Sequence, residues 1–487
     1  MHDSQEPVTT SRFDAVWPKL AWLVYALTIP VRAWYVFVWH DPQKFIYSDM
    51  ATYVSQAVLF TDPTYTQGIA DTIYPPGTGY LFGFLFRLGG DSLWPVVLSQ
   101  FVGSCVIPIL VYAIAARLFS RRTALAALVL ASLYFHFLAY AGFFLSETVY
   151  TVLVLLAFWF IVMAVQATDP LRQVLCSLLV GWTVGSAAAV KSGILLPFFL
   201  LALGIASIFV IRRRILAFVS LAAIAAGALA LVLAPLAMRA TKLCDGQFCL
   251  VSTNAEMNFL MGHSGRSLRF VWNDAKRNYR FEFAHPASVQ KGYDEPRTLA
   301  FGPYDRKENL AAAWAWIGDH PWEAFAQSVD HVYDYFTGTV PWPSSHGPER
   351  VAMTFFERLY AFFWLVPAAA MVLRLIPRWL RRERGYAGDF LAVMPVAGMT
   401  VVSFLTIAEP RYRVPFDGFT CILAARFYTT WWSRDVEPGR SILPADGVTD
   451  PVPVAAETRD ALTGTAEPAP AGEATPAPGA VAPSDRG

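Results

Sequence analysis

The sequence predicts an all-α polytopic membrane protein of about ten transmembrane helices, with a small mixed extracytoplasmic domain and interfacial helices. Of its 487 residues, 55% are hydrophobic and 15% are charged, whereas soluble domains average about 25% charged residues. A soluble protein of this length has no core large enough for so many apolar side chains, so the surrounding solvent is lipid. The net charge of +1 gives no field that would favour nucleic acid as a partner.

Apolar stretches of about 20 residues, the length that crosses a bilayer as a helix, recur along most of the chain. The candidate spans cover residues 17–39, 92–116, 123–143, 147–166, 173–190, 193–211, 214–238, 354–376, 389–408 and 414–432. Two longer runs contain breaks, around Tyr140 to Glu147 in the first and at Lys191-Ser192-Gly193 in the second. We therefore expect each of these runs to cross the membrane twice.

The arginines between the spans predict the orientation, because short cytoplasmic loops are enriched in basic residues. With the N-terminus in the cytoplasm, every cytoplasmic loop carries arginine: Arg117, Arg121, Arg122, Arg172, Arg212, Arg213, Arg214, Arg378, Arg381, Arg382, Arg384 and Arg434. The chain then divides into a cytoplasmic N-terminus (1–16), seven spans with a first outer loop at 40–91 (17–238), an extracytoplasmic domain (239–353), three spans (354–432) and a disordered cytoplasmic tail (433–487). Within the domain, aromatic residues at helical spacing from Trp322 to Phe336, after Pro321, predict an interfacial helix.

The first outer loop contains an acid about ten residues beyond the first span, in Ser48-Asp49-Met50-Ala51-Thr52-Tyr53. A partly desolvated carboxylate at the membrane surface could act as a general base on a hydroxyl group. The alternative, which the local sequence favours, is that Ser48 or Asp49 caps a helix. Further along the loop, Tyr74-Pro75-Pro76-Gly77 fixes an extended entry into the next helix, so this segment is expected to shape a site.

Four cations lie at outer helix ends, on the side where basic residues are disfavoured. They are Lys191, Arg239, Arg411 and Arg413. A lipid phosphate at headgroup depth would need such cations, and the alternative is snorkelling to the interface. Glu147, at the outer end of the fourth span, needs a partner or a task at this depth, unless it only caps the helix.

Cysteines and histidines give little indication of cofactor chemistry. Cys244 and Cys249 flank a four-residue turn and either form a disulfide in an oxidising compartment or stay as two free thiols. The histidines lack metal-ligand spacing, so no metal or other cofactor is assigned. No glycine-rich phosphate-binding motif is present either, which argues against ATP-driven transport.

Four motifs together resemble the GT-C superfamily of membrane glycosyltransferases. The branch with protein O-mannosyltransferases and the bacterial transferase that adds aminoarabinose to lipid A is the most similar. The matching stretches are Ser48 to Tyr53, Tyr74 to Gly77, Leu145-Ser146-Glu147, and Glu409-Pro410-Arg411-Tyr412-Arg413-Val414-Pro415. Weaker similarity covers Val251 to Gly262 and Asp319-His320-Pro321-Trp322. The chain departs from the family in lacking a second acid beside Asp49, which argues against a metal-assisted mechanism, and in having Lys191 where many relatives carry Arg-Pro.

The resemblance implies an inverting glycosyltransferase. The topology puts its active site on the extracytoplasmic face, with a bacterial inner membrane as the preferred location and the endoplasmic reticulum as the alternative. The donor would be a polyprenyl-phosphate sugar, and the acceptor a glycolipid, polysaccharide or protein. Asp49 would be the base. Lys191, Arg239, Arg411 and Arg413 would hold the phosphate, with Tyr53, Tyr74, Pro75, Pro76, Glu147, Glu409 and Tyr412 binding substrate or shaping the site.

The main alternative is a transporter or flippase of a lipid-linked substrate, since such a protein also needs many spans and a few buried charges. A purely structural membrane protein would leave the outward cations unexplained. For a transferase we expect Asp49, Glu147, Lys191 and Arg411 to line one outward-facing cavity that opens sideways to lipid. For a transporter, polar groups should follow a path through the middle of the membrane.

Overall fold

Helices form most of the part of the chain that the computed structural model describes, which is residues 12–46, 48–211, 215–274, 277–283, 295–338, 347–381, 386–407 and 409–431. The longer helices coincide with the apolar stretches, so the all-α polytopic membrane fold is confirmed. The predicted tail at 433–487 and most of the predicted N-terminal segment at 1–16 lie outside the described residues.

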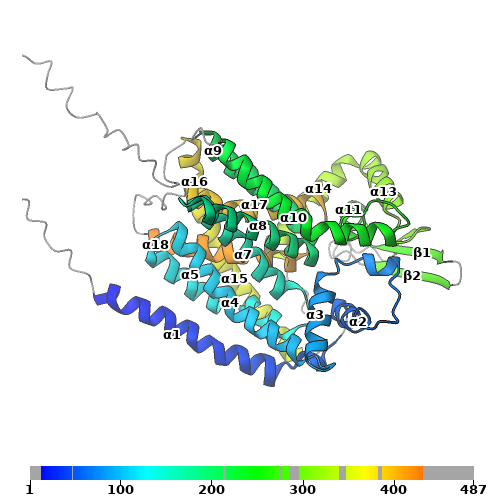
Figure 1. The fold of residues 1–487 in the computed structure, drawn as a ribbon, viewed down its shortest axis with the longest axis horizontal. Coiled ribbons are helices and arrows are strands. Elements are labelled where there is room, and N and C mark those ends of the chain that lie inside the picture. Colours follow the sequence, from blue (N-terminus) through cyan, green and yellow to red (C-terminus); the bar gives the residue numbers. More distant parts are fainter. Residues whose placement is uncertain are drawn as a thin grey trace, which may run out of the picture. The chain divides into compact units, whose positions relative to one another are not determined.

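The elements follow one another along the chain as a bundle of long helices interrupted by two sets of shorter elements (Figure 1). The α-helices are α1 (Arg12–Trp34), α2 (Asp49–Leu59), α3 (Gly77–Leu88), α4 (Trp94–Leu118), α5 (Arg121–Leu133), α6 (Phe135–Ala139), α7 (Glu147–Gln166), α8 (Pro170–Val190), α9 (Leu195–Ile211), α10 (Ile215–Leu243), α11 (Asn254–Gly262), α13 (Arg306–Asp319), α14 (Pro321–Thr337), α15 (Gly347–Tyr360), α16 (Val366–Leu380), α17 (Ala387–Leu405) and α18 (Asp417–Thr430). Short 3₁₀ or π segments are η1 (Tyr35–Trp39), η2 (Pro42–Lys44), η3 (Ile69–Thr72), η4 (Tyr140–Gly142), η5 (Ser192–Ile194), η6 (Ala361–Leu365) and η7 (Pro410–Phe416).

The predicted number of spans is not confirmed. Within the described residues, seven helices are long and apolar enough to cross a membrane, and a bent pair formed by Arg121–Leu133 and Phe135–Gly142 makes up to eight. The sixth and tenth predicted spans correspond to α9, with 17 residues, and α18, with 14. Helix α18 is less apolar than the other spans. Other helices surround it, so its buried Asp417 and Arg426 have partners within the protein.

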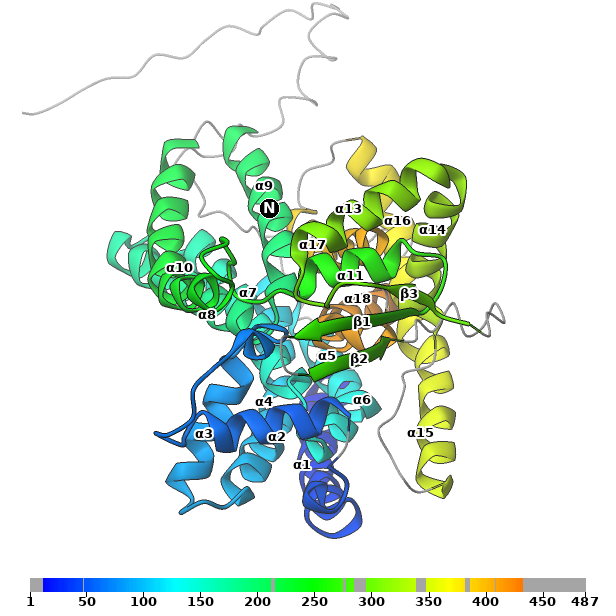
Figure 2. The same cartoon turned by 90° about the vertical axis from the view of Figure 1, so that its right-hand side faces the viewer.

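The elements of the two predicted outer segments lie at the same end of the bundle. Helices α2 and α3 of the first segment, and α11, α13 and the sheet of the second, gather at the right of Figure 1, and Figure 2 looks onto this end. The sheet consists of β1 (Leu268–Asp274), β2 (Arg277–Phe283) and β3 (Arg297–Leu299) in the order β2-β1-β3. Strand β1 runs antiparallel to β2 and parallel to β3.

A small core of its own holds this second segment together. Buried Leu268, Phe270 and Leu299 of the sheet pack with Leu260 of α11 and Ala313 of α13. The segment therefore contains both helices and strands, although α10 extends to Leu243, beyond the predicted boundary at 239. Its position on the extracytoplasmic side stays a prediction.

The predicted interfacial helix corresponds to α14, whose two faces have the opposite polarity to those of a helix in a soluble protein. Its buried face includes Gln327, Ser328 and His331, whereas Trp322 and Tyr333 are 82% and 67% exposed. An exposed aromatic face beside a bundle of spans is suited to the headgroup region of a bilayer.

The Tyr-Pro-Pro-Gly segment brings the start of α3 into close contact with the end of α8. A β-carbon on Gly77 would lie 2.6 Å from the backbone carbon and oxygen of Ala189. Only glycine fits here, because backbone atoms cannot move aside as a flexible side chain can. The contact holds the first predicted outer loop next to Lys191, where α8 ends.

Gly77→Ala is therefore expected to destabilise the protein by about 1–3 kcal/mol, the range for an added methyl group in a well-packed position. The thermal midpoint of the detergent-solubilised protein would measure this. Gly68→Ala is the matched control, because a β-carbon on Gly68 meets nothing within 4 Å. An unchanged midpoint in Gly77→Ala would contradict the close contact.

Candidate active site

The acid of the first predicted outer loop bonds to side chains far away in the sequence. Asp49 is the first residue of α2, and its Oδ2 lies 2.7 Å from Nη2 of Arg411. Its Oδ1 accepts a hydrogen bond of 3.1 Å from the hydroxyl of Tyr74. The preceding residue, Ser48, has a positive φ of 53° and makes no side-chain cap. The carboxylate thus faces other elements, and the capping alternative has no hydrogen bond to support it.

A second ion pair lies at the breaks between the long helices. Lys191 follows the last residue of α8, and its Nζ lies 2.7 Å from Oε1 of Glu147, the first residue of α7. Glu147 is 1% exposed and Lys191 20%. A carboxylate at a helix N-terminus is stabilised by the helix dipole, which helps to explain why α7 begins with an acid.

Both ion pairs line one cavity of about 170 Å³. Its lining comes from α2, the segment before α3, α7, the α8–α9 connection, α11, α17 and η7. The predicted residues among the lining are Asp49, Tyr53, Tyr74, Pro75, Glu147, Lys191, Arg411 and Tyr412. Glu409 does not line the cavity but forms an ion pair with Arg411. Asp49, Glu147, Lys191 and Arg411 therefore meet in one cavity, whereas its facing outward and its opening toward lipid stay predictions.

The electrostatics of the cavity keep the acid ionised. Burial favours the neutral form of Asp49, but the Arg411 guanidinium and the hydrogen bond from Tyr74 outweigh it, so the pKa of Asp49 lies below its ordinary value. The neighbouring acids raise the pKa of Arg411 despite its burial. Burial raises the pKa of Tyr53 and Tyr74, so both phenols are neutral and can donate hydrogen bonds.

Tyr412 connects the two cations of the cavity. Its ring centroid lies 5.2 Å from Nζ of Lys191 and 5.7 Å from the guanidinium carbon of Arg411. Such cation–π contacts stabilise positive charge that is partly removed from water. The arrangement keeps the two cations close to each other despite their like charge.

Two predicted phosphate-binding arginines do not line this cavity. Arg239 donates to the side chain of Gln67 at 2.7 Å and to the carbonyl of Asp71 at 3.3 Å, which attaches the first predicted outer loop to α10. Arg413 is 2% exposed and pairs with Glu357 at 3.2 Å and Asp417 at 3.5 Å. In η7, residues two positions apart point in different directions, since a 3₁₀ helix has about three residues per turn. Arg411 therefore faces the cavity, whereas Arg413 anchors η7 in the bundle.

Sequence reasoning missed several lining residues. Tyr150 lies one helical turn after Glu147, and the spacing of three residues could have indicated it. Asn254 and Asn258 of α11 also line the cavity, together with Met399 of α17 and Thr406, the residue that follows this helix. Nothing in the local sequence marks the α17 residues, because they resemble any apolar span.

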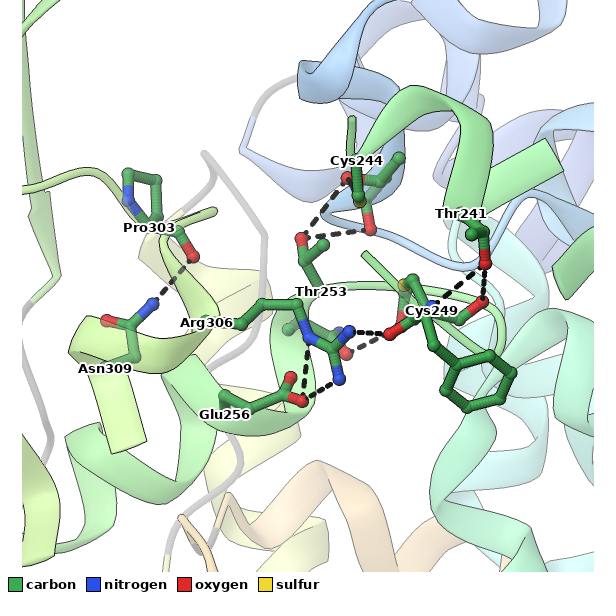
Figure 3. Close-up of polar contacts among 12 residues, drawn as sticks. Thr241, Cys244, Cys249, Thr253, Glu256, Pro303, Arg306 and Asn309 are labelled. Carbon is green, nitrogen blue, oxygen red and sulfur yellow. Dashed lines mark hydrogen bonds and ion pairs between the residues drawn. The ribbon is translucent and has the colours of Figure 1, made fainter. Parts of the chain in front are cut away.

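The two cysteines near the end of α10 are both buried and both free thiols, so the disulfide alternative is not realised in this structure (Figure 3). The backbone N–H of Cys249 donates to Thr241 at 3.1 Å. Thr253 in turn donates its backbone N–H to the carbonyl of Thr72 at 2.7 Å, which connects this turn to the first predicted outer loop. Within the described ranges, no group of three or more His, Cys, Asp or Glu side chains is arranged to hold a metal ion.

Among solved structures, the chain is similar to an Archaeoglobus fulgidus oligosaccharyltransferase, solved in complex with Zn and sulfate. The identity is 13%, the TM-score is 0.48, and the match covers 84% of this chain and 49% of that one. The chain thus spans about half the length of that protein. It is also similar to ArnT from Cupriavidus metallidurans in the apo state, at 15% identity and a TM-score of 0.34, over 85% of this chain and 76% of that one. No curated protein matches the chain.

A known protein family matches a part of the chain that contributes several residues to the cavity lining. Residues 74–238 match the family described as dolichyl-phosphate-mannose-protein mannosyltransferase. This range includes Tyr74, Glu147 and Lys191 of the cavity. Over residues 74–238, the predicted resemblance to the protein O-mannosyltransferase branch of membrane glycosyltransferases is therefore confirmed.

Proposed function

We propose that this chain is a membrane glycosyltransferase that moves a sugar from a polyprenyl-phosphate donor to an acceptor hydroxyl group. The observation that carries the proposal is the cavity in which Asp49 and Glu147 meet Lys191 and Arg411. The family matched at residues 74–238 supports a donor of this class, because its description names a lipid-phosphate sugar. The acceptor would be a glycolipid, a polysaccharide or a protein.

The proposed reaction is a direct displacement with inversion at the anomeric carbon. Asp49 accepts the proton of the acceptor hydroxyl while the oxygen of that hydroxyl forms the new bond to the anomeric carbon. The bond from that carbon to the phosphate oxygen breaks, and its electron pair leaves with the lipid phosphate. Arg411 and Lys191 stabilise the negative charge on the phosphate. A good leaving group opposite a single base requires no covalent sugar intermediate.

Substrate binding would exchange the partners of the two cations. Arg411 already contacts Asp49 and Glu409, and Lys191 contacts Glu147. A phosphate that binds Arg411 draws the guanidinium away from Asp49 and raises the pKa of that carboxyl, because burial then acts with less compensation. Asp49 thus becomes a stronger base when the donor is in place.

An apolar groove between the helices that follow Glu147 and Lys191 fits the lipid part of the donor. Its volume is about 460 Å³, and it is lined by residues of α7, α8, α9 and α10. Leu195, Phe198, Ala202, Ile205 and Phe209 form one face of α9 along it. Leu195 lies four residues after Lys191, so a prenyl chain in this groove would keep its phosphate near the lysine.

The proposed site faces the extracytoplasmic side of a bacterial inner membrane. The arginine-rich loops predict this orientation, and the short elements of both predicted outer segments gather at the end of the bundle that carries the cavity (Figure 1). A donor and an acceptor would both be available there without a nucleotide.

The proposal is tested by supplying the purified protein, in liposomes, with radiolabelled polyprenyl-phosphate sugars and an extract of cell-envelope acceptors. The expected result is consumption of at least one donor, release of free polyprenyl phosphate and label in the acceptor fraction. Movement of an intact labelled donor across the bilayer, without its cleavage, would instead identify the protein as a transporter.

A further inference from the structure

One wall of the active-site cavity carries neutral amides instead of charges. Helix α11 contributes Asn254, Ala255 and Asn258 to the lining. The two asparagines are four residues apart and therefore lie on the same face of the helix. Glu256, between them in the sequence, lies off this face and does not line the cavity. Its Oε1 instead accepts a hydrogen bond of 2.8 Å from Nε of Arg306 (Figure 3).

The hydrogen bonds leave these amides available to a ligand. The Ser252 hydroxyl donates to Oδ1 of Asn254 at 2.9 Å, which fixes the orientation of that amide and leaves its NH₂ group for another acceptor. For the side chain of Asn258 there is no hydrogen-bond partner among the residues that the structure describes. Each carboxamide offers two donor hydrogens and an acceptor oxygen.

We infer that Asn254 and Asn258 recognise hydroxyl groups of a sugar ring in the cavity and so determine which sugar is used. The inference rests on the proposed function, because it assumes that the cavity binds a sugar. Amides can donate to and accept from adjacent hydroxyls, as a polyhydroxylated ring requires. Being uncharged, they do not compete with Lys191 and Arg411 for the phosphate. The ring belongs either to the donor or to a glycan acceptor.

The inference predicts a coupling between Asn258 and one hydroxyl group of the substrate. The experiment compares wild type with Asn258→Ala on a series of polyprenyl-phosphate sugars that each lack one hydroxyl, and separately on octyl hexoside acceptors that each lack one hydroxyl. A site built to bind a hydroxyl discriminates strongly against the analogue without it. We expect wild type to lose about 10²-fold or more in kcat/KM on one deoxy compound, and the variant to lose about 10-fold or less on the same compound.

Coupling in the donor series assigns the amide to the transferred sugar, and coupling in the acceptor series assigns it to the acceptor. Either result supports recognition of a hydroxyl. Equal losses in wild type and variant at every position, in both series, would overturn the inference. That failure is distinct from failure of the proposed function, in which wild type itself would transfer no sugar.

Two substitutions control for indirect effects. Asn309→Ala makes the same change in a buried amide of α13 that bonds to the Pro303 carbonyl at 3.1 Å (Figure 3). Glu256→Ala disturbs α11 from its other face. Both are expected to lower thermal stability without altering the discrimination between sugars. Binding of polyprenyl phosphate without a sugar should be equal in wild type and Asn258→Ala, since the amide does not contact the phosphate.

Discussion

Asp49→Asn is expected to lower kcat/KM for sugar transfer by about 10²–10⁴-fold, the usual contribution of a general base. Asparagine has the same size and can still accept the hydrogen bond from Tyr74, which the carboxylate receives at 3.1 Å. It cannot take a proton from the acceptor hydroxyl. Initial rates of transfer with a purified donor would measure the effect, and the amount of protein in the membrane should stay the same.

The matched control is Asp62→Asn, in the same predicted outer loop. Asp62 accepts hydrogen bonds from Thr64 at the surface and does not line the cavity. This variant should transfer sugar at the wild-type rate. Asp49→Asn should also bind free polyprenyl phosphate at least as well as wild type, because Arg411 loses a competing carboxylate. Full transfer activity in Asp49→Asn would exclude Asp49 as the base.

The sequence allowed most of the fold and part of the site to be predicted. The long spans follow from apolar length alone, and the break at Lys191 follows from three residues that interrupt an apolar run. Helix α18 does not follow from apolar length. It lies in the interior of the bundle, where protein and not lipid surrounds it. Its charged residues Asp417 and Arg426 are therefore stabilised by contacts with neighbouring helices.

The sequence alone does not distinguish the roles of the four outer cations from one another. Lys191, Arg239, Arg411 and Arg413 all lie at helix ends with the same expected depth. Which of them faces the cavity depends on contacts with distant elements, such as Gln67 for Arg239 and Glu357 for Arg413. Such contacts have no local signature, because partners far apart in the chain meet only after the helices pack.

Arg411→Ala is expected to lower kcat/KM for the donor by about 10²–10³-fold, as when one group that stabilises developing charge is removed from a dry site. The dependence on acceptor concentration should change much less. Arg411 lies beside Asp49 and Glu409 in the cavity wall and is the planar donor best suited to a phosphate. Equal changes for donor and acceptor would contradict this role.

The same substitution should shift the pH dependence of the reaction. In wild type, Arg411 holds the pKa of Asp49 below 3.8, its ordinary value, against the opposing effect of burial. Without the guanidinium, burial favours the protonated acid and only Tyr74 and Lys191 oppose it, so the pKa of Asp49 rises. Because only the ionised form acts as a base, kcat/KM of Arg411→Ala should begin to fall at a higher pH than that of wild type as the solution is acidified.

Arg411→Lys separates the two effects of the arginine. Lysine retains the positive charge but loses the planar pair of donors that binds a phosphate. The pH at which kcat/KM of Arg411→Lys begins to fall on acidification should therefore stay close to that of wild type. Its KM for the donor should rise. If Arg411→Ala and wild type lose activity at the same pH, the group that titrates is not Asp49, and the carboxylate that removes the acceptor proton must be sought elsewhere in the cavity, first at Glu147.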